Sequence, residues 1–365
     1  MLSSGAHLGS GAVARRSDKI IAIDLYCGAG GLSYGLQEAG LKVAAGFDLD
    51  PNCEYPFQQN IEAPFLQRDV RELTAAHLEA LWPKGCVRVL AGCAPCQPFS
   101  PHRRGADTSD EDRWSLLSEF GRLVAEALPT VITMENVPRL AGTEVFTDFI
   151  ATLDDLGYFV NWRSCHGPYF GLAQNRRRLV LLASRLGPIE VPLGNRTGKA
   201  PTVREVIGDL PPIAHGGFDP GDPLHKARHL TDVNLARLRA SSPGGTWEEW
   251  PEELRAQCHR RRSGATFRNV YARMEWDKPS PTITTLAHNF GTGRFGHPTQ
   301  DRAISLREAS MLQGFPRDYA FVRPSDPIYF TSLGRLIGNA VPPPLGRVVG
   351  SAIIAHVARR QPFSA

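Results

Sequence analysis

Long apolar runs are absent from this 365-residue sequence, and lysine and cysteine are scarce. No apolar run approaches the roughly 18 residues of a membrane-spanning helix, so the sequence argues against an integral membrane protein. Only six of the 41 basic residues are lysines, and the net charge of +4 permits a nucleic-acid partner without requiring one. Hydrophobic residues make up 42% and charged residues 21%, which excludes a disordered or fibrous chain.

The seven cysteines are odd in number and irregularly spaced, so they do not suit a disulfide framework. We therefore expect a reducing, cytoplasmic environment. Cys93 and Cys96 form the single Cys-x-x-Cys pair, and zinc would need a second pair of ligands, so we expect no metal. The pair could instead be redox-active, or one of the two thiols could be a nucleophile.

Short apolar segments alternate with helical periodicity in the first half of the chain. The pattern predicts strands over residues 20–25, 43–47, 87–91, 131–134 and 179–183. It predicts helices over residues 32–39, 113–128 and 145–156. This alternation favours an α/β fold, a Rossmann-like and largely parallel sheet with helices on both faces.

Composition divides the chain into two expected domains after a flexible tail, residues 1–18. Residues 19–186 and 327–365 are expected to form the main domain, since the apolar C-terminal segment can return to it. Residues 187–326 are rich in Gly, Pro, Arg and His and predict a smaller, irregular domain. Two capping boxes, Thr202-x-x-Glu205 and Ser305-x-x-Glu308, predict short helices there.

A glycine-rich loop, Asp24-Leu25-Tyr26-Cys27-Gly28-Ala29-Gly30-Gly31, stands where the first strand turns into a helix. Glycine lets the backbone approach a ligand there, and the helix N-terminus offers free N–H groups. Asp48 ends the next strand, where a carboxylate suits a ribose diol. The loop predicts a nucleotide-like cofactor and leaves NAD and S-adenosylmethionine open, with a packing turn as the structural alternative.

Candidate catalytic residues stand next to three other predicted strands. Two of them follow a strand, and a pair of arginines precedes one. Cys96, in the proline-fixed loop Gly92-Cys93-Ala94-Pro95-Cys96-Gln97-Pro98-Phe99-Ser100, is a candidate nucleophile. Glu135 follows strand 131–134 and could hydrogen-bond a substrate or cap a helix. Arg176 and Arg178 precede strand 179–183 on one predicted face, where they suit an anion or form a solvated turn.

The ordered motifs resemble those of the C5-cytosine DNA methyltransferase family. They are Asp-Leu-Tyr-x-Gly-x-Gly-Gly, Pro-Cys-Gln, Glu-Asn-Val, Gln-x-Arg-x-Arg and the late loop Gly338-Asn339-Ala340-Val341. Arg273-Met274-Glu275-Trp276, Pro281-Thr282-Ile283-Thr284 and Leu312-Gln313-Gly314-Phe315-Pro316 resemble further family motifs. The resemblance covers residues 19–185 and 270–350, and residues 187–270 fall in the family's variable target-recognition region.

The resemblance implies a DNA (cytosine-5-)-methyltransferase with an S-adenosylmethionine-dependent methyltransferase sheet and a smaller target-recognition domain. Such an enzyme flips a cytosine out of duplex DNA and methylates C5 through an adduct between Cys96 and C6. The donor S-adenosylmethionine leaves as S-adenosylhomocysteine. Glu135 resembles the residue that contacts the N3 and N4 edge, and Arg176 and Arg178 resemble arginines near the base and the nucleophile.

Cofactor and DNA positions follow from the same resemblance. The implied cofactor-binding residues are Asp24, Tyr26, Gly28, Gly30, Gly31, Asp48, Asp69, Pro95, Asn339 and Val341, with Asp48 on the ribose and Asp69 on the adenine amino group. The expected DNA-contacting residues are Gln97, Ser100, Arg260, Arg261, Arg262, Arg268 and Arg273. Residues 99–113 resemble a mobile loop over the flipped base.

Three positions depart from the family pattern: Tyr26 replaces Phe, Ala173 replaces Pro, and Asp48 replaces Glu. None removes a reacting group, so we expect activity. A tRNA cytosine-5 methyltransferase of the same fold and a non-enzymatic DNA-binding relic are alternatives, and the glycine loop alone would also suit a nicotinamide dehydrogenase. We expect a monomeric bacterial enzyme at the nucleoid, either stand-alone or paired with a cognate restriction endonuclease.

Overall fold

The computed structural model describes residues 19–95, 110–261 and 266–360, with the backbone alone for residues 110–115. The chain divides into two compact units. Unit 1 takes its residues from Met1–Cys165, Arg178–Leu193 and Leu345–Ala365, and unit 2 consists of His166–Arg177 and Gly194–Pro344.

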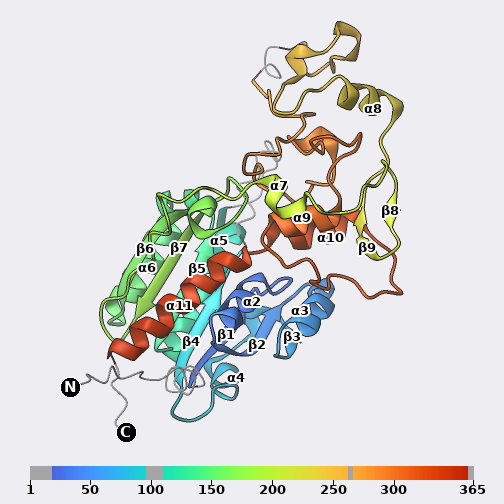
Figure 1. Cartoon of the computed structure of the whole chain (residues 1–365). Helices are drawn as coiled ribbons and strands as arrows, with labels where there is room; N and C mark the ends of the chain where they lie inside the picture. Colours follow the sequence, from blue (N-terminus) through green and yellow to red (C-terminus); the bar gives the residue numbers. More distant parts are fainter. Residues whose placement is uncertain (1–18, 96–109, 262–265, 361–365) are drawn as a thin grey trace, which may run out of the picture. The chain divides into compact units, whose positions relative to one another are not determined.

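Unit 1 is built on a seven-stranded sheet with the order β3-β2-β1-β4-β5-β7-β6 (Figure 1). The strands are β1 (Ile20–Leu25), β2 (Lys42–Asp48), β3 (Phe65–Gln67), β4 (Val87–Gly92), β5 (Val131–Asn136), β6 (Phe159–His166) and β7 (Arg177–Ser184). The first five strands in this order pair in parallel, whereas β7 runs antiparallel to β5. The predicted Rossmann-like α/β fold is therefore confirmed, and the antiparallel strand makes the sheet mixed.

Helices cover both faces of this sheet, because its strands are apolar on both sides. They are α2 (Gly31–Glu38), α3 (Glu54–Asn60), α4 (Ala75–Glu79), α5 (Asp110–Ala127), α6 (Glu144–Asp155) and α11 (Pro343–Arg360), with 3₁₀ helices η1 (Pro51–Cys53), η2 (Val70–Glu72) and η4 (Pro138–Gly142). Helix α5 packs beside α4 and α6. Helix α11 packs closely on α2, since a Cβ on Gly346 would lie 2.9 Å from the Leu32 carbonyl oxygen.

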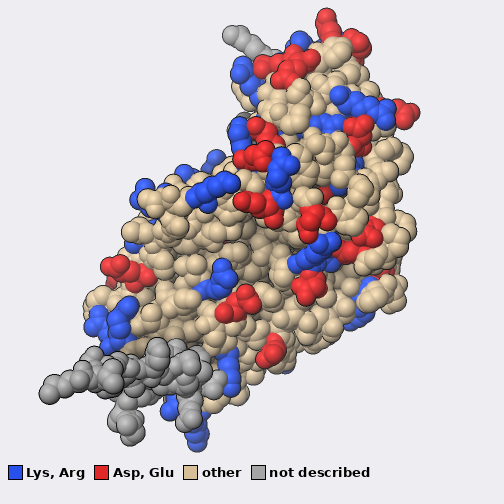
Figure 2. All heavy atoms as spheres, viewed as in Figure 1, with Lys and Arg blue, Asp and Glu red and all other residues tan. Residues whose placement is uncertain are grey.

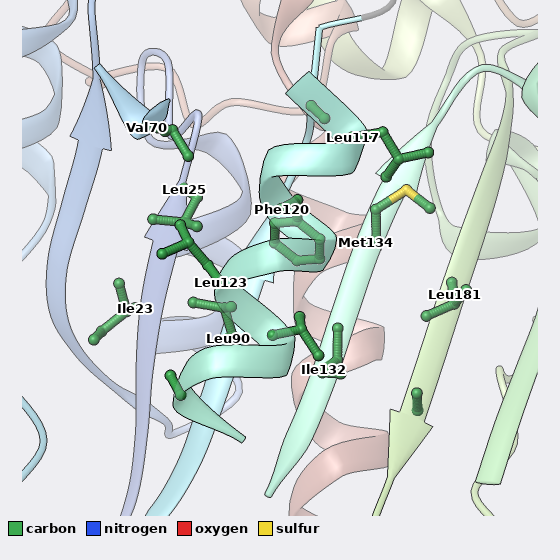
Figure 3. Packing of buried hydrophobic residues seen from close by; sticks show 14 of the residues in the cluster. Ile23, Leu25, Val70, Leu90, Leu117, Phe120, Leu123, Ile132, Met134 and Leu181 are labelled. Carbon is green, nitrogen blue, oxygen red and sulfur yellow. The ribbon is translucent and has the colours of Figure 1, made fainter. Parts of the chain in front are cut away.

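The main core lies between α5 and the sheet. Figure 3 shows Leu117, Phe120 and Leu123 of α5 facing side chains of four strands. These strand residues are Ile23 and Leu25 of β1, Leu90 of β4, Ile132 and Met134 of β5, and Leu181 of β7. Burying this apolar surface holds the carboxyl ends of β1, β4 and β5 in a fixed register.

Unit 2 has little regular structure, as the sequence predicts for most of it. It contains the hairpin β8 (Phe218–Asp219) and β9 (Asp222–Lys226), the helices α7 (Val203–Ile207), α8 (Asp232–Arg239), α9 (Leu306–Leu312) and α10 (Phe330–Asn339), and the 3₁₀ helices η5 (Gly167–Phe170), η6 (Trp247–Glu249), η7 (Glu252–Leu254) and η8 (Phe290–Thr292). Both predicted capping boxes are present, at the start of α7 and of α9.

The unit bounds differ from the predicted domain bounds in three short segments. Residues 166–177 and 327–344 belong to unit 2, and residues 187–193 belong to unit 1. The functional division into a catalytic and a recognition domain stays a prediction. Among the residues that the structure describes, none of the helices is long and apolar enough to cross a bilayer.

Candidate active site

The loop after β1 has an unusual backbone. Tyr26, Gly28 and Gly30 have φ angles of 59°, 54° and 88°, all in the left-handed region. Glycine adopts this region without a steric cost, but tyrosine does not. The Tyr26 hydroxyl donates to the Leu116 carbonyl oxygen of α5 at 2.8 Å, which fastens the strained residue. The loop thus holds the N-terminus of α2 open at the end of β1.

Asp48 joins this loop to the end of β2. One carboxylate oxygen accepts from the Gly28 N–H at 2.9 Å, and the other accepts from the Asp50 N–H at 2.9 Å. Burial raises the pKa of Asp48. Each carboxylate oxygen has a second lone pair, so Asp48 can still accept from two hydroxyl groups. The geometry suits a ribose diol, the role that the sequence assigned to it.

Asp24 is a buried carboxyl group, and within the described residues only one of its two oxygens accepts a hydrogen bond. Its Oδ2 accepts from the Ser33 hydroxyl at 2.7 Å, whereas Oδ1 has no partner within the described part of the chain. Burial raises the pKa of Asp24 to about 7. A buried acceptor without a donor is costly, so Asp24 Oδ1 is suited to a donor group of a ligand. The α-amino group of S-adenosylmethionine is such a donor, and the cofactor fits this carboxyl group.

Asp69 and Pro95 complete the predicted cofactor residues of unit 1. Asp69 precedes η2 and accepts from the Arg71 backbone N–H at 3.0 Å and from its guanidinium. The hydrogen bonds from Arg71 lower the pKa of Asp69. Pro95 lies exposed after β4. The structure leaves the predicted roles of both residues as predictions.

Glu135 lies near the end of β5, and its side chain is buried. The Glu135 Oε1 forms an ion pair with Arg178 Nε at 2.9 Å, and Oε2 accepts from the Cys93 thiol at 3.1 Å. Neighbouring Asn136 donates from its side-chain amide to the Ala94 carbonyl oxygen at 3.0 Å. The ends of β4, β5 and β7 thus bring a carboxylate, a thiol and an arginine together.

The other predicted residues of the late motifs lie in unit 2. Arg176 is buried and donates to the carbonyl oxygens of Ile283 at 3.1 Å and Gly338 at 3.3 Å. Asn339 ends α10 with an exposed side chain, and Val341 is buried. Arg176 therefore holds the backbone just before Asn339 in place, within unit 2.

The predicted DNA-contacting arginines are a mixed set. Arg260, Arg261 and Arg268 are exposed. Arg273 is buried instead and donates to the carbonyl oxygens of Leu238, Ser241, His297 and Gln300 at 2.7–3.1 Å. A guanidinium that binds four carbonyl groups and pairs with Asp301 at 2.5 Å serves to pack unit 2. We therefore correct its assignment and leave Arg273 out of the DNA-contacting set.

Several predicted residues lie outside the described part of the chain. They are the candidate nucleophile Cys96, the DNA-contacting residues Gln97, Ser100 and Arg262, and most of the expected loop 99–113. The described segment before Cys96 ends with Cys93, Ala94 and Pro95.

Sequence reasoning missed two residues that organise the site. The Ser33 hydroxyl donates to the Asp24 carboxylate at 2.7 Å, and its place in the first turn after the glycine loop is a usable signal. Gln174 is buried in unit 2, donates to the Leu312 carbonyl oxygen at 2.9 Å and accepts from the Ile283 N–H at 2.9 Å. Gln174 is the first residue of the Gln-x-Arg-x-Arg motif, and this position in the motif is the signal that could have identified it.

Comparisons with known proteins agree with the motifs. The profile of the C-5 cytosine-specific DNA methylase family matches residues 20–355. The chain is 48% identical over 335 residues to the Type II methylase M.HgiDII of Herpetosiphon aurantiacus, covering 91% of this chain and 94% of that protein.

Two solved structures share the fold. A methyltransferase encoded within an E. coli prophage superposes with a TM-score of 0.70 at 19% identity, covering 93% of this chain and 99% of the other. The Dnmt2 methyltransferase of S. pombe gives a TM-score of 0.60 at 16% identity, with 93% and 98% covered.

Proposed function

Since the chain belongs to the C-5 cytosine-specific DNA methylase family, we propose that Cys96, Glu135 and Arg178 carry its methyl transfer to cytosine. The expected activity, that of an S-adenosylmethionine-dependent DNA (cytosine-5-)-methyltransferase, is confirmed by this membership. The family's substrate is DNA, which argues against a tRNA methyltransferase, and its activity argues against a nicotinamide dehydrogenase. The residue roles go further than membership does. The observation that carries them is the Glu135 carboxylate, held by Arg178 at 2.9 Å beside the strand end that leads to Cys96.

The chemistry explains why these residue types are needed. C5 of cytosine is a weak nucleophile, and addition of the Cys96 thiolate to C6 turns the ring into a reactive enamine. The addition places negative charge on the ring. A proton that Glu135 delivers to N3 and the positive charge of Arg178 beside it stabilise that charge. Once C5 carries the methyl group, loss of the C5 proton to a base breaks the bond between Cys96 and C6, expels the thiolate and restores the ring.

We assign the cofactor to the loop from Asp24 to Gly31 together with Asp48, Asp69 and Pro95, while the cofactor roles of Asn339 and Val341 stay predictions from the sequence. When bound, S-adenosylmethionine supplies an electrophilic methyl sulfonium. Asp24 offers a donor of the ligand a buried oxygen that has no partner among the described residues, and Asp48 offers two lone pairs to hydroxyl groups. The N-terminus of α2 adds N–H groups at the same strand end.

The DNA-contacting set that we propose is Gln97, Ser100, Arg260, Arg261, Arg262 and Arg268. Arg260 donates to the Glu252 carbonyl oxygen at 2.9 Å, and Arg268 lies 3.4 Å from a Glu248 carboxylate oxygen. These bonds are exposed and therefore weak, so phosphate groups can replace the acceptors. Arginine is also the residue that best reads guanine edges.

The relative from Herpetosiphon aurantiacus is a type II methylase, and its similarity supports the same place for this chain. We propose a bacterial modification enzyme, stand-alone or paired with a restriction endonuclease of the same recognition sequence. It acts as a monomer at the nucleoid in the cytoplasm, where its duplex substrate lies.

The residue roles are tested by single-turnover methyl transfer to duplex DNA. Cys96→Ser abolishes transfer, because a hydroxyl is a poor nucleophile at neutral pH. Glu135→Gln lowers the rate by about 10²-fold or more, which is the usual contribution of a positioned acid or base. Exposed Glu190→Gln serves as the matched control and keeps the native rate. A native rate for Cys96→Ser or for Glu135→Gln would refute the role of that residue.

A further inference from the structure

The position of Cys93 follows from strand register. Strands β4 and β5 are parallel neighbours, and Gly92 of β4 aligns with Met134 of β5. The next residues, Cys93 and Glu135, therefore stand side by side with their side chains on the same face. The Cys93 Sγ lies 3.1 Å from Glu135 Oε2, on the opposite carboxylate oxygen from Arg178.

The backbone around Cys93 has little freedom to move. The Cys93 N–H donates to the Leu25 carbonyl oxygen of β1 at 3.3 Å, and the Ala94 carbonyl oxygen accepts from the Asn136 side chain at 3.0 Å. Gly92 packs so tightly that a Cβ there would lie 2.7 Å from the Phe120 ring. Three strands and α5 thus fix the point from which the thiol projects.

The chemistry decides the direction of the hydrogen bond. An ionised carboxylate can only accept, and a thiol has one proton to donate. Arg178 holds the other oxygen in an ion pair, with its Nε 2.9 Å from Oε1. With the thiol on one oxygen and the guanidinium at the other, the carboxyl group cannot rotate about its terminal bond without losing both contacts. A side chain without a donor at position 93 would remove this hydrogen bond, and the orientation of the Glu135 carboxyl group would be less fixed.

We propose that Cys93 is a positioning residue for methyl transfer, and that its thiol proton fixes the orientation of the Glu135 carboxylate. The inference rests on the proposed catalytic role of Glu135. Cys93 acts through Glu135 and not on the base, so its own reactivity is not required. A hydroxyl at the same place donates equally, whereas a methyl group does not.

The test compares Cys93→Ala with Cys93→Ser in the full-length chain. We expect Cys93→Ala to lower kcat for methylation of duplex DNA about tenfold, in keeping with the loss of a hydrogen bond to a charged group. Cys93→Ser keeps kcat within about twofold, and the KM values for DNA and S-adenosylmethionine stay unchanged in both variants. The matched control is Cys86→Ala, which removes the half-buried thiol just before β4 and leaves kcat unchanged.

The Glu135→Gln background separates this inference from the proposed function. Cys93→Ala causes no further loss of kcat there, because the group that it positions is already disabled. Equal kcat for Cys93→Ala and the native chain, with Glu135→Gln slow, would overturn the role of Cys93 alone. Equal losses in Cys93→Ala and Cys93→Ser would overturn it too, whereas a fully active Glu135→Gln would refute the proposed function itself.

Discussion

Carboxyl groups stand at several strand ends of unit 1. The carboxyl group of Asp24 lacks a hydrogen bond, because Ser33 donates to one oxygen and the other has no partner within the described residues. An isolated buried carboxylate is expensive, so the group retains its proton to an unusually high pH. Burial accordingly raises the pKa of Asp24 to about 7.

This shift has a consequence for stability without cofactor. Between about pH 4 and pH 7 the folded protein holds the Asp24 proton that the unfolded chain has already lost, so the free energy of unfolding falls as pH rises. The fall amounts to a few kcal/mol at most. Asp24→Asn removes this part of the pH dependence, as measured by urea unfolding at pH 5 and pH 8.

Exposed Asp155→Asn on α6 is the control and keeps the native pH dependence. An Asp24→Asn variant that loses stability between pH 5 and pH 8 as steeply as the native chain does would contradict the assignment.

The sequence allowed some residue roles to be predicted and not others. Asp48 and Glu135 could be found because polar residues that end buried strands meet at one edge of a sheet. The contact between Cys93 and Glu135 could not, since it depends on the register between β4 and β5. Arg273 was misread because nearby arginines suggested a basic surface, whereas tertiary packing buries its guanidinium among four carbonyl groups.

At the scale of elements, the apolar strands were predictable and the edge of the sheet was not. The predicted strand 20–25 coincides with β1, and the strand predicted over residues 87–91 ends one residue short of β4. Strand β6 was missed because its residues are largely part-exposed at the edge of the sheet and show no continuous apolar run. The capping boxes of α7 and α9 were predictable, since each is a local pattern of four residues.

Strand β4 and helix α5 pack tightly against each other near the site. Gly92→Ala would bring a methyl group within 2.7 Å of the Phe120 ring and 3.1 Å of the Leu25 carbonyl oxygen. We expect it to lower the free energy of unfolding by about 1–3 kcal/mol through overpacking. The measurement is urea unfolding of the variant and the native chain.

Gly142→Ala is the matched control, because a Cβ at Gly142 meets nothing within 4 Å. It leaves the stability unchanged or raises it slightly, as the unfolded chain loses entropy. If Gly92→Ala proved as harmless as Gly142→Ala, the account of this contact would be wrong.

At the scale of the whole molecule, basic and acidic residues are nearly balanced in number. On the face that Figure 2 shows, basic and acidic side chains are interspersed over the described residues. This matches the net charge of +4 from 41 basic and 37 acidic residues. Because the net charge is small, we expect binding to DNA to rely on selected arginines and on readout of base edges.

The two units are stabilised in different ways. Unit 1 fixes carboxylates at strand ends by apolar packing, whereas unit 2 is held by buried arginines such as Arg273 and Arg302. A framework of short elements and loops tolerates sequence variation in its exposed parts. The proposal that unit 2 recognises the target and that the strand ends of unit 1 carry the cytosine chemistry agrees with this difference.

Bisulfite sequencing of DNA from a methylation-free bacterial host that expresses the chain tests the central claim most directly. We predict 5-methylcytosine at one position of one short recognition sequence, and none in the same host expressing Cys96→Ser. Bisulfite sequencing of the tRNA from the same cells serves as the second readout, with no new methylation expected. Unmethylated DNA, or methylation that appears in tRNA alone, would contradict the account.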